Sequence, residues 1–235
     1  NAPVENCANL AFSFLTGAMD EGFYRNKLTG YTKTAFDSLQ AKYAGRLMNH
    51  SADTLFRHRI ELIPNCGHSI DYSLTTPWLK TYKRNPYPHT LMWEDYPMDG
   101  QHRQGFYNLY VMQRPKAADG LKDASGEDRD YYEMDIQNNV IRLSVKKVTY
   151  QTVERDPVYG IDLKFTKNYH PVSGGKWKIY LNDQLVDMNK PVTVFINDRK
   201  AFEGKIVPRM EDMITSCMEY FDPCRVFPAS VDVAL

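Results

Sequence analysis

The chain has 235 residues, of which 43% are hydrophobic and 25% charged, so it can bury a core large enough for one or two folded domains. Its 29 basic and 29 acidic residues cancel, which removes the net positive field that would hold a nucleic acid or an anionic membrane surface. No apolar run approaches the roughly 20 residues that cross a bilayer, so the sequence predicts no membrane span.

The first third of the chain predicts the element order β-α-β-α. Residues 9–16 form a short apolar run that ends at Gly17, as expected for a strand buried on both faces of a parallel sheet. Apolar residues recur at steps of three and four over 26–45 and predict an amphipathic helix. Residues 56–63 alternate and predict a second strand, and a short helix with Pro77 near its start follows. Parallel strands joined by a right-handed crossover are therefore expected.

After residue 88 the pattern changes to short strands at regular spacing, which is typical of a β-sandwich. The predicted strands cover residues 90–96, 105–112, 131–136, 140–150, 160–166, 177–181 and 191–196. Asn138-Asn139 and Asn197-Asp198 predict hairpin turns, because Asn and Asp tolerate positive φ. Lys116 to Asp130 is polar and contains glycine, which predicts a mobile loop.

The end of the chain returns to a helical pattern. A helix is predicted over about 209–220, with one apolar face, and residues 227–233 predict a last strand. The residues expected on the apolar face are Met210, Met213, Ile214 and Cys217. The predicted fold class is thus α/β plus all-β, with a partial α/β unit at 1–88 and a β-sandwich-like domain at 89–235 that carries one helix near its end.

The four cysteines, Cys7, Cys66, Cys217 and Cys224, indicate no metal site. No CxxC pair and no matching histidine pair is present, so their spacing fits no zinc pattern. We expect four buried free thiols, with a Cys217–Cys224 disulfide as the alternative. No metal or organic cofactor is indicated.

Two residues lie where parallel sheets carry their functional loops. Asp20 follows the first predicted strand and His68 follows the second, in each case beyond the carboxyl end. An aspartate can accept the Nδ1–H of the histidine, which leaves Nε2 to take a proton from a nucleophile. The order acid then histidine is that of the α/β-hydrolase triad, in which the serine comes first on a G-x-S-x-G turn. The alternative for Asp20 is a turn or helix-cap aspartate.

The segment around these residues resembles a known family. The Thr-Gly-x-x-Asp strand end, the long helix and the strand closing on Pro-Asn-Cys-Gly-His-Ser are similar to the last segments of α/β-hydrolase esterases and peptidases, over about residues 8–88. The poly-hydroxyalkanoate depolymerase-like and dienelactone hydrolase-like branches are the most similar, and stretches like 83–88 and 187–194 occur in large multidomain hydrolases of this type. The resemblance implies Asp20 as triad acid, His68 as general base, and an exported protein in the periplasm or outside the cell.

The sequence departs from that family in one large respect. No G-x-S-x-G occurs in the 235 residues, so we expect this polypeptide alone to be inactive. The opening Asn-Ala-Pro suggests a piece of a longer protein. Missing upstream strands would leave an open sheet edge, and a homodimer that pairs through this edge would cover it.

Several other residues have both a functional and a structural interpretation. Ser69 neighbours His68 but lacks the glycines of a nucleophile turn, so helix capping is expected. Tyr24-Arg25-Asn26 would line a substrate cleft or cap the following helix through Asn26. His102 and His170 are expected in surface loops. The aromatic residues of the strands would form a sugar-stacking platform or, as expected, sandwich core; they are Trp93, Tyr96, Phe106, Tyr107 and Tyr110.

Two functions follow. In the first, the chain supplies the acid and base of a serine hydrolase that acts on a small ester or amide. In the second, it is a non-enzymatic module whose β-domain binds a polysaccharide or a protein.

Overall fold

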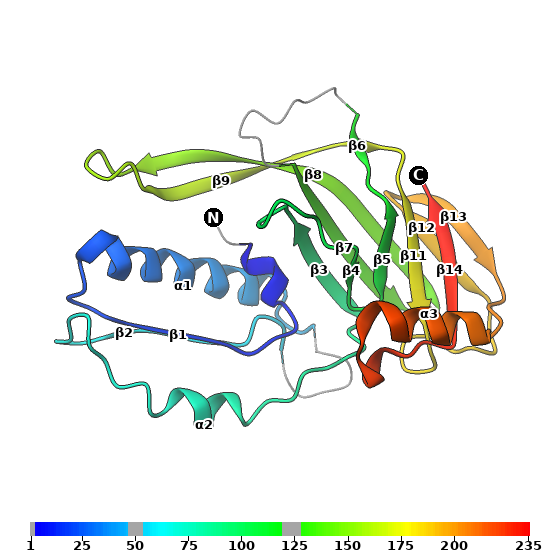
Figure 1. Ribbon diagram of the computed structural model, residues 1–235, viewed down its shortest axis with the longest axis horizontal. Helices are drawn as coiled ribbons and strands as arrows, with labels where there is room; N and C mark the ends of the chain where they lie inside the picture. Colours follow the sequence, from blue (N-terminus) through cyan, green and yellow to red (C-terminus); the bar gives the residue numbers. More distant parts are fainter. Residues whose placement is uncertain (1–2, 47–53, 119–127) are drawn as a thin grey trace. The chain divides into compact units, whose positions relative to one another are not determined.

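The computed structural model describes residues 3–46, 54–118 and 128–235. Most of the regular structure is β, in several sheets with few helices (Figure 1). The chain forms two compact units. The first unit comprises Asn1–Asn85 and Tyr150–Lys167, and the second comprises Pro86–Thr149 and Asn168–Leu235. Residues 150–167 were predicted to belong to the domain at 89–235. In the structure they belong to the first unit.

The first unit is built on two parallel strands. β1 (Phe12–Gly17) pairs in register with β2 (His58–Ile63), and α1 (Arg25–Lys42) joins them. A parallel pair needs such a crossover, because a tight turn would reverse the chain. With α2 (Thr75–Leu79), the predicted order β-α-β-α and the parallel pairing are confirmed.

β1 is not buried on both faces, contrary to the expectation for residues 9–16. Leu15 and Ile60 are buried, but the side chains of Phe14 and Leu62 are 42% and 40% exposed. Phe36 of α1 stacks on Phe12 at a ring-centroid distance of 4.9 Å. This two-stranded sheet therefore keeps apolar surface that the described part of the unit does not cover.

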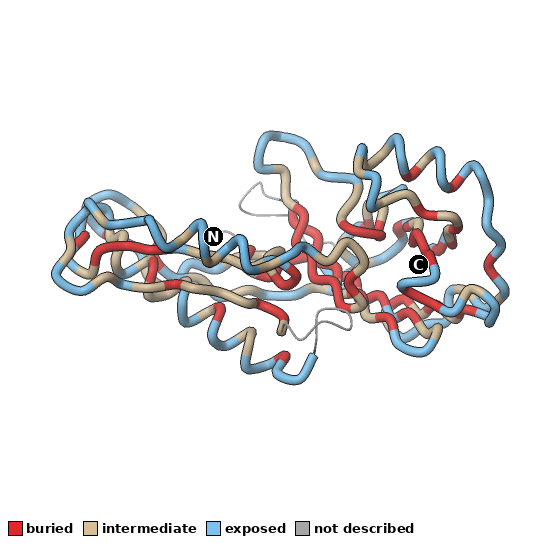
Figure 2. The backbone as a smooth tube through the Cα atoms, turned by 90° about the horizontal axis from the view of Figure 1, so that it is seen from below, coloured by how far each residue is buried: buried red, intermediate tan, exposed pale blue. Residues whose placement is uncertain are grey.

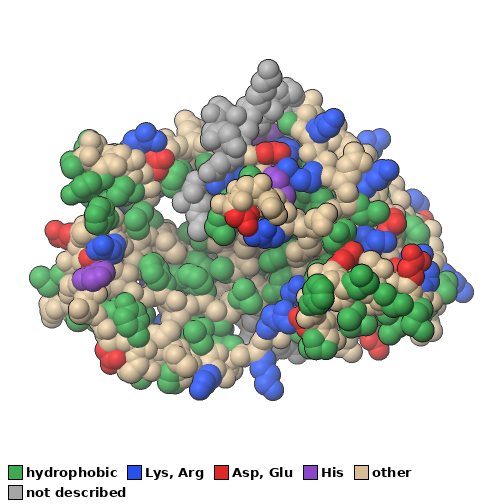
Figure 3. Space-filling view, viewed as in Figure 1, with side chains coloured by type: hydrophobic (Ala, Val, Ile, Leu, Met, Phe, Trp, Pro, Cys, Tyr) green, Lys and Arg blue, Asp and Glu red, His purple; other side chains and the backbone are tan. Residues whose placement is uncertain are grey.

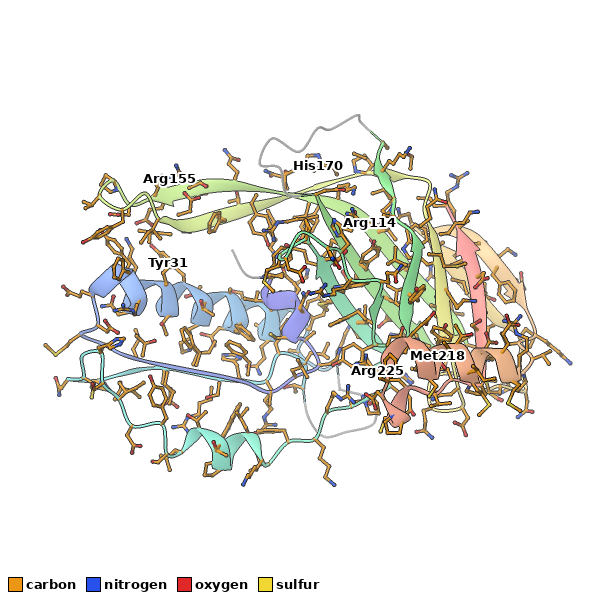
Figure 4. The ribbon with its side chains drawn as sticks, in the orientation of Figure 1. Tyr31, Arg114, Arg155, His170, Met218 and Arg225 are labelled. Atoms are coloured by element: carbon orange, nitrogen blue, oxygen red, sulfur yellow. The ribbon has the colours of Figure 1, made fainter. Side chains whose placement is uncertain are left out.

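The outer part of a long hairpin completes the first unit. β8 (Val140–Arg155) continues well past the predicted end at residue 150 and pairs with β9 (Asp162–His170). In Figure 4, Tyr31 of α1 points toward this hairpin, and its hydroxyl donates to Glu154 at 2.8 Å. The Tyr24 hydroxyl donates to Asp156 at 2.6 Å. These hydrogen bonds help attach the hairpin to α1, and no local pattern in the sequence predicted them.

The second unit contains two main sheets. The strand order of the larger is β13-β12-β8-β7-β3, with β9 paired to β8, and that of the smaller is β14-β11-β5-β4. The strands not yet introduced are β3 (Thr90–Asp95), β4 (Gly105–Phe106), β5 (Leu109–Gln113), β7 (Arg129–Gln137), β11 (Lys176–Leu181), β12 (Val192–Ile196), β13 (Arg199–Gly204) and β14 (Ala229–Ala234). The two-residue strands β6 (Lys116–Ala117) and β10 (Val172–Ser173) pair with each other.

Both main sheets contribute to one apolar core. Trp93, Tyr132 and Leu143 of the larger sheet belong to the same buried cluster as Trp177 and Ile179 of the smaller. Figure 2 shows long buried stretches along these strands. The core interpretation is confirmed for Trp93 and Tyr107, each 3% exposed.

Turn residues were predicted well in this unit, and the strands β6, β10 and β13 were missed. Asn138, Asn139, Asn197 and Asp198 all have positive φ, between 46° and 64°, as primed hairpin turns require. The predicted strand 105–112 is broken at Tyr107, where φ is 53°. β13 was not predicted because its residues are mostly polar and exposed.

The predicted C-terminal helix is present as α3 (Met210–Tyr220), and the apolar residues predicted on one face of it are exposed. Asp212 and Ser216 are buried, whereas Met210 and Ile214 are 72% and 53% exposed. Asp212 accepts from Arg209 at 2.9 Å and from Ser230 at 2.8 Å. Hydrophobic side chains therefore gather on the outer surface of α3 (Figure 3).

Several smaller expectations can be compared with the structure. The predicted last strand is β14, and the short helices η1 (Val4–Cys7), η2 (Gly22–Tyr24) and η3 (Pro223–Arg225) were not predicted. Residues 119–127 of the mobile loop expected over 116–130 lie outside the described residues, and the prediction is wrong at both ends, which belong to β6 and β7. All four cysteines are free thiols, as expected, but none is fully buried: Cys7 and Cys66 are half-buried, and Cys217 and Cys224 are exposed. In the part of the chain that the structure describes, no helix has the length and hydrophobicity to cross a membrane.

Candidate functional site

Asp20 lies directly beyond the carboxyl end of β1. After Gly17 the backbone turns, and the amide of Asp20 donates to the carbonyl of Gly17 at 3.0 Å. The amide of Ala18 still bonds to Ile63 at 2.9 Å, so the turn starts from a fixed strand end. The Asp20 residue is 7% exposed. A carboxylate is thus held in a sheltered position at the functional edge of a parallel sheet.

His68 reaches the same edge from β2. A turn that includes Asn65, whose φ is 57°, follows this strand, and the carbonyl of Cys66 accepts from the amide of Met19 at 2.9 Å. The backbone of this loop passes so close to Gly17 that a Cβ there would lie 1.9 Å from the Gly67 carbonyl oxygen. Only glycine allows this approach, and the approach brings the two loops together.

The two side chains form a hydrogen bond. Nδ1 of His68 lies 2.9 Å from Oδ2 of Asp20, and Arg25 donates to the other carboxylate oxygen at 3.0 Å. The hydrogen bond from His68 and, to a smaller extent, the interaction with Arg25 lower the pKa of Asp20, against the opposing effect of burial. Asp20 is therefore ionised at neutral pH, and as an ionised carboxylate it can only accept, so Nδ1 carries the hydrogen.

This arrangement leaves the second ring nitrogen of His68 available. The His68 side chain is 76% exposed, whereas that of Asp20 is 8% exposed. With Nδ1 protonated and oriented by the carboxylate, neutral imidazole presents the lone pair of Nε2 outward. The pair can accept a proton from a nucleophile and stabilise the imidazolium that results.

Ser69 has neither of the roles considered for it. α2 begins at Thr75 and has Leu74 at its N-cap position, so the predicted capping role of Ser69 is wrong. Ser69 is exposed and follows His68 directly. Among the described residues, no hydroxyl or thiol forms a hydrogen bond with Nε2 of His68.

The Tyr24-Arg25-Asn26 segment supports the Asp20 loop. Tyr24 occupies the N-cap position of α1 with φ of 59° and no side-chain cap, and the predicted capping by Asn26 is wrong. Asn26 instead donates to the carbonyl of Ala18 at 3.0 Å. Together with the contact from Arg25, this bond ties the first turn of α1 to the loop that carries Asp20.

A second cluster with a histidine lies in the second unit. Asp95 and Asp130 face each other on β3 and β7, and Nδ1 of His102 lies 2.6 Å from Oδ2 of Asp95. One potential ligand atom from each of these three residues lies within 4.8 Å of the others. His102 lies in the loop between β3 and β4, as expected, but its side chain is only 19% exposed and so is not a surface side chain. His170, also expected in a loop, ends β9 and bonds to Thr149 at 2.9 Å.

Basic side chains already occupy the carboxylate oxygens of this cluster. Arg114 and Lys147 each lie 2.6 Å from an oxygen of Asp130, and the amide of Arg103 donates to Asp95 at 3.0 Å. Burial nevertheless raises the pKa of Asp130. A metal ion would have to displace these cations, so the residues fit a buried ion-pair network better than a metal site.

The sequence indicated the first site and missed this network. Asp20 and His68 could be found because each follows a strand of one parallel pair. The partners Asp95, Asp130 and Lys147 are aligned only by strand register, and their spacing in the sequence carries no comparable signal.

No protein-family model, curated protein or solved structure matches this chain. Any assignment of function therefore depends on the geometry of the residues themselves.

Proposed function

We propose that this chain carries the acid and the base of a serine hydrolase that cleaves a small ester or amide. One observation supports this most directly. Asp20 and His68 are hydrogen-bonded at 2.9 Å beyond the ends of two adjacent parallel strands, with the rest of the histidine side chain exposed. In acyl-transfer enzymes this pair orients the imidazole toward the nucleophile.

The chemistry follows from the hydrogen bonds. Nε2 of His68 takes the proton of a serine hydroxyl as that oxygen attacks the substrate carbonyl, and then returns it to the leaving group. The ionised Asp20 stabilises the imidazolium during this step. Arg25, on the other oxygen of Asp20, keeps the carboxylate ionised and fixed. This reaction requires neither a metal nor an organic cofactor.

The serine in this proposal comes from outside the 235 residues, which contain no G-x-S-x-G. The two-stranded parallel sheet of the first unit supports such an addition. Parallel sheets are normally wider and covered on both faces, yet Phe14 and Leu62 are partly exposed here. Further strands of a longer protein, or a second copy pairing at this edge, would cover them. The resemblance to α/β-hydrolases agrees with the first option and is the sole ground for proposing an exported protein.

A second candidate function is binding of a protein through the second unit. Its support is the outward surface of α3, where Met210 and Met218 are 72% and 65% exposed and Phe221 is 89% exposed. Apolar surface of this kind marks protein contacts. A sugar platform has less support, because Trp93 and Tyr107 are in the core and Arg129 lies over the Tyr96 ring at 4.3 Å.

A fluorophosphonate probe tests the hydrolase proposal, because it labels activated serines. We would label the longest natural polypeptide that contains this sequence, its His68→Gln and Ser69→Ala variants, and the 235-residue chain. We expect labelling of the natural polypeptide and of Ser69→Ala, a rate lower by about 10³-fold or more in His68→Gln, and no labelling of the 235-residue chain.

Two results would contradict the proposal. One is a folded natural polypeptide that does not react with the probe. The other is a His68→Gln variant that reacts as fast as the unchanged protein. Circular dichroism of each variant separates loss of the base from loss of the fold.

A further inference from the structure

A cavity of about 590 Å³ lies within the first unit, between α1, η1 and the β8–β9 hairpin. This volume is in the range of small-molecule sites, roughly 300–1,000 Å³. Its lining comes from segments far apart in the sequence, including Val4, Leu28 and Phe165. The cavity lies away from the Asp20 and His68 loops, since neither residue contributes to it.

The walls of this cavity are mainly apolar. Phe12, Leu28, Ala35, Phe36, Leu163 and Phe165 contribute aromatic and aliphatic surface. The hydroxyls of Thr32 and Thr34 donate to backbone carbonyls of α1, at 2.9 and 3.0 Å. These donors are therefore already used, and burial raises the pKa of the Cys7 thiol so that it stays neutral. A polar molecule would find few partners along most of this surface.

The charged side chains at the cavity differ in whether they are paired. Lys167 lies 2.6 Å from Glu5, and Asp162 is held by Arg155 at 2.6 and 3.1 Å. Lys164 lies over the Tyr31 ring at 5.9 Å, and its ammonium forms no ion pair with any residue that the structure describes. The nearby Glu154 contacts Lys27 and Tyr31, and its charge attracts Lys164 without forming an ion pair with it. One positive charge thus remains available at the edge of an apolar cavity.

We propose that this cavity binds a single-chain acyl carboxylate, with the chain along the apolar walls and the carboxylate at Lys164. A single available ammonium matches one carboxylate, and the remaining walls favour a hydrocarbon chain over a polar one. The proposal is independent of the proposed hydrolase function, because it uses none of the residues of the Asp20–His68 site.

Binding can be measured with cis-parinaric acid, a carboxylate whose fluorescence rises in apolar surroundings, and with competition by dodecanoate and dodecan-1-ol. Two variants, each with its own control variant, complete the design. Ala35→Trp fills the cavity, while Ala41→Trp adds the same ring at an exposed position of α1 outside it. Lys164→Gln removes the available charge, while Lys80→Gln removes an exposed lysine elsewhere in the unit.

We expect saturable binding in the unchanged chain and in both controls, with dodecanoate competing better than dodecan-1-ol. Ala35→Trp should weaken binding of both competitors at least about tenfold, because it removes the volume that the hydrocarbon chain needs. Lys164→Gln should weaken dodecanoate about fivefold and leave dodecan-1-ol unchanged, as expected for one partly exposed ion pair.

Methyl NMR of the unchanged chain gives a test that does not depend on any variant folding. Dodecanoate should shift the signals of Val4, Leu28 and Leu163, which line the cavity, and leave Leu62 unaffected. Absence of these shifts, or equal affinities for the acid and the alcohol, would overturn the proposal. Unchanged binding in a folded Ala35→Trp variant would do the same.

Discussion

The two units of this protein differ in how completely they bury their apolar residues. The second unit encloses large aromatic and aliphatic residues between two sheets, and Trp177, Leu109 and Leu143 are at most 1% exposed. The first unit has two parallel strands and leaves Phe14 and Leu62 partly exposed. Apolar burial between two sheets supports the second unit, whereas the first unit buries a smaller apolar group, including Phe36 and Phe56, and has surface left for additional strands.

The largest expected effect comes from the core of the second unit. Leu143→Ala should lower the free energy of unfolding by about 3 kcal/mol or more, because it leaves a cavity in a fully buried cluster. Leu62→Ala in the first unit should cost less than about 1 kcal/mol, since that side chain is 40% exposed. Urea denaturation followed by tryptophan fluorescence and by methyl NMR would measure both. Equal losses would contradict the contrast between the units.

The next largest loss of stability is expected in the buried ion-pair network of the second unit. Asp130→Asn removes the charge that Arg114 and Lys147 share at 2.6 Å, and we expect a loss of about 3 kcal/mol. Glu203→Gln is the control, because its ion pair with Lys200 is exposed on both sides, and it should change stability by less than about 0.5 kcal/mol. Urea denaturation again provides the measurement. Similar values for the two variants would show that the network contributes nothing beyond a surface pair.

The loop approach in the first unit predicts a smaller effect on stability and a specific effect on the site. Gly17→Ala places a methyl group 1.9 Å from the Gly67 carbonyl oxygen, so the loops must separate at a cost of about 1–3 kcal/mol. Gly67→Ala meets no atom within 4 Å and serves as the control. Nitrogen-15 NMR of the His68 ring should show loss of the Nδ1–H form in Gly17→Ala alone. An unchanged ring signal would mean that the approach does not position the pair.

The smallest expected effect is a difference in pH dependence. The pKa of Asp20 is lowered in the folded state, chiefly by the hydrogen bond from His68. Its contribution to stability is therefore present above the unfolded value of about 3.9 and is lost as the pH falls through the folded pKa. The first unit should lose stability below about pH 4 more steeply in the unchanged chain than in Asp20→Asn.

Methyl NMR signals of the first unit, recorded against pH, would measure this difference. The neighbouring Glu21 is exposed, and Glu21→Gln should follow the unchanged chain. Superimposable curves for Asp20→Asn and the unchanged chain would show that the His68 bond does not stabilise the folded state.

Local sequence patterns predicted most elements because each pattern reports on a single segment. The steps of three and four over 26–45 identified α1, and Asn138-Asn139 and Asn197-Asp198 identified turns whose residues do adopt positive φ. The same reasoning placed Met210 and Ile214 of α3 on one face but did not determine which face packs inward. Asp212 and Ser216 are the buried residues, through bonds to Arg209, Ser230 and Phe227.

The sequence by itself determined the order of the elements, the parallel pair β1–β2 and the positions of Asp20 and His68 beyond those strands. The tertiary structure alone decided that residues 150–167 join α1, that His102 bonds to Asp95, and that Asp130 lies opposite Asp95. The physical reason is the range of each interaction. Periodicity and turn chemistry act within a few residues, whereas strand register and ion pairing join residues whose separation along the chain carries no signal.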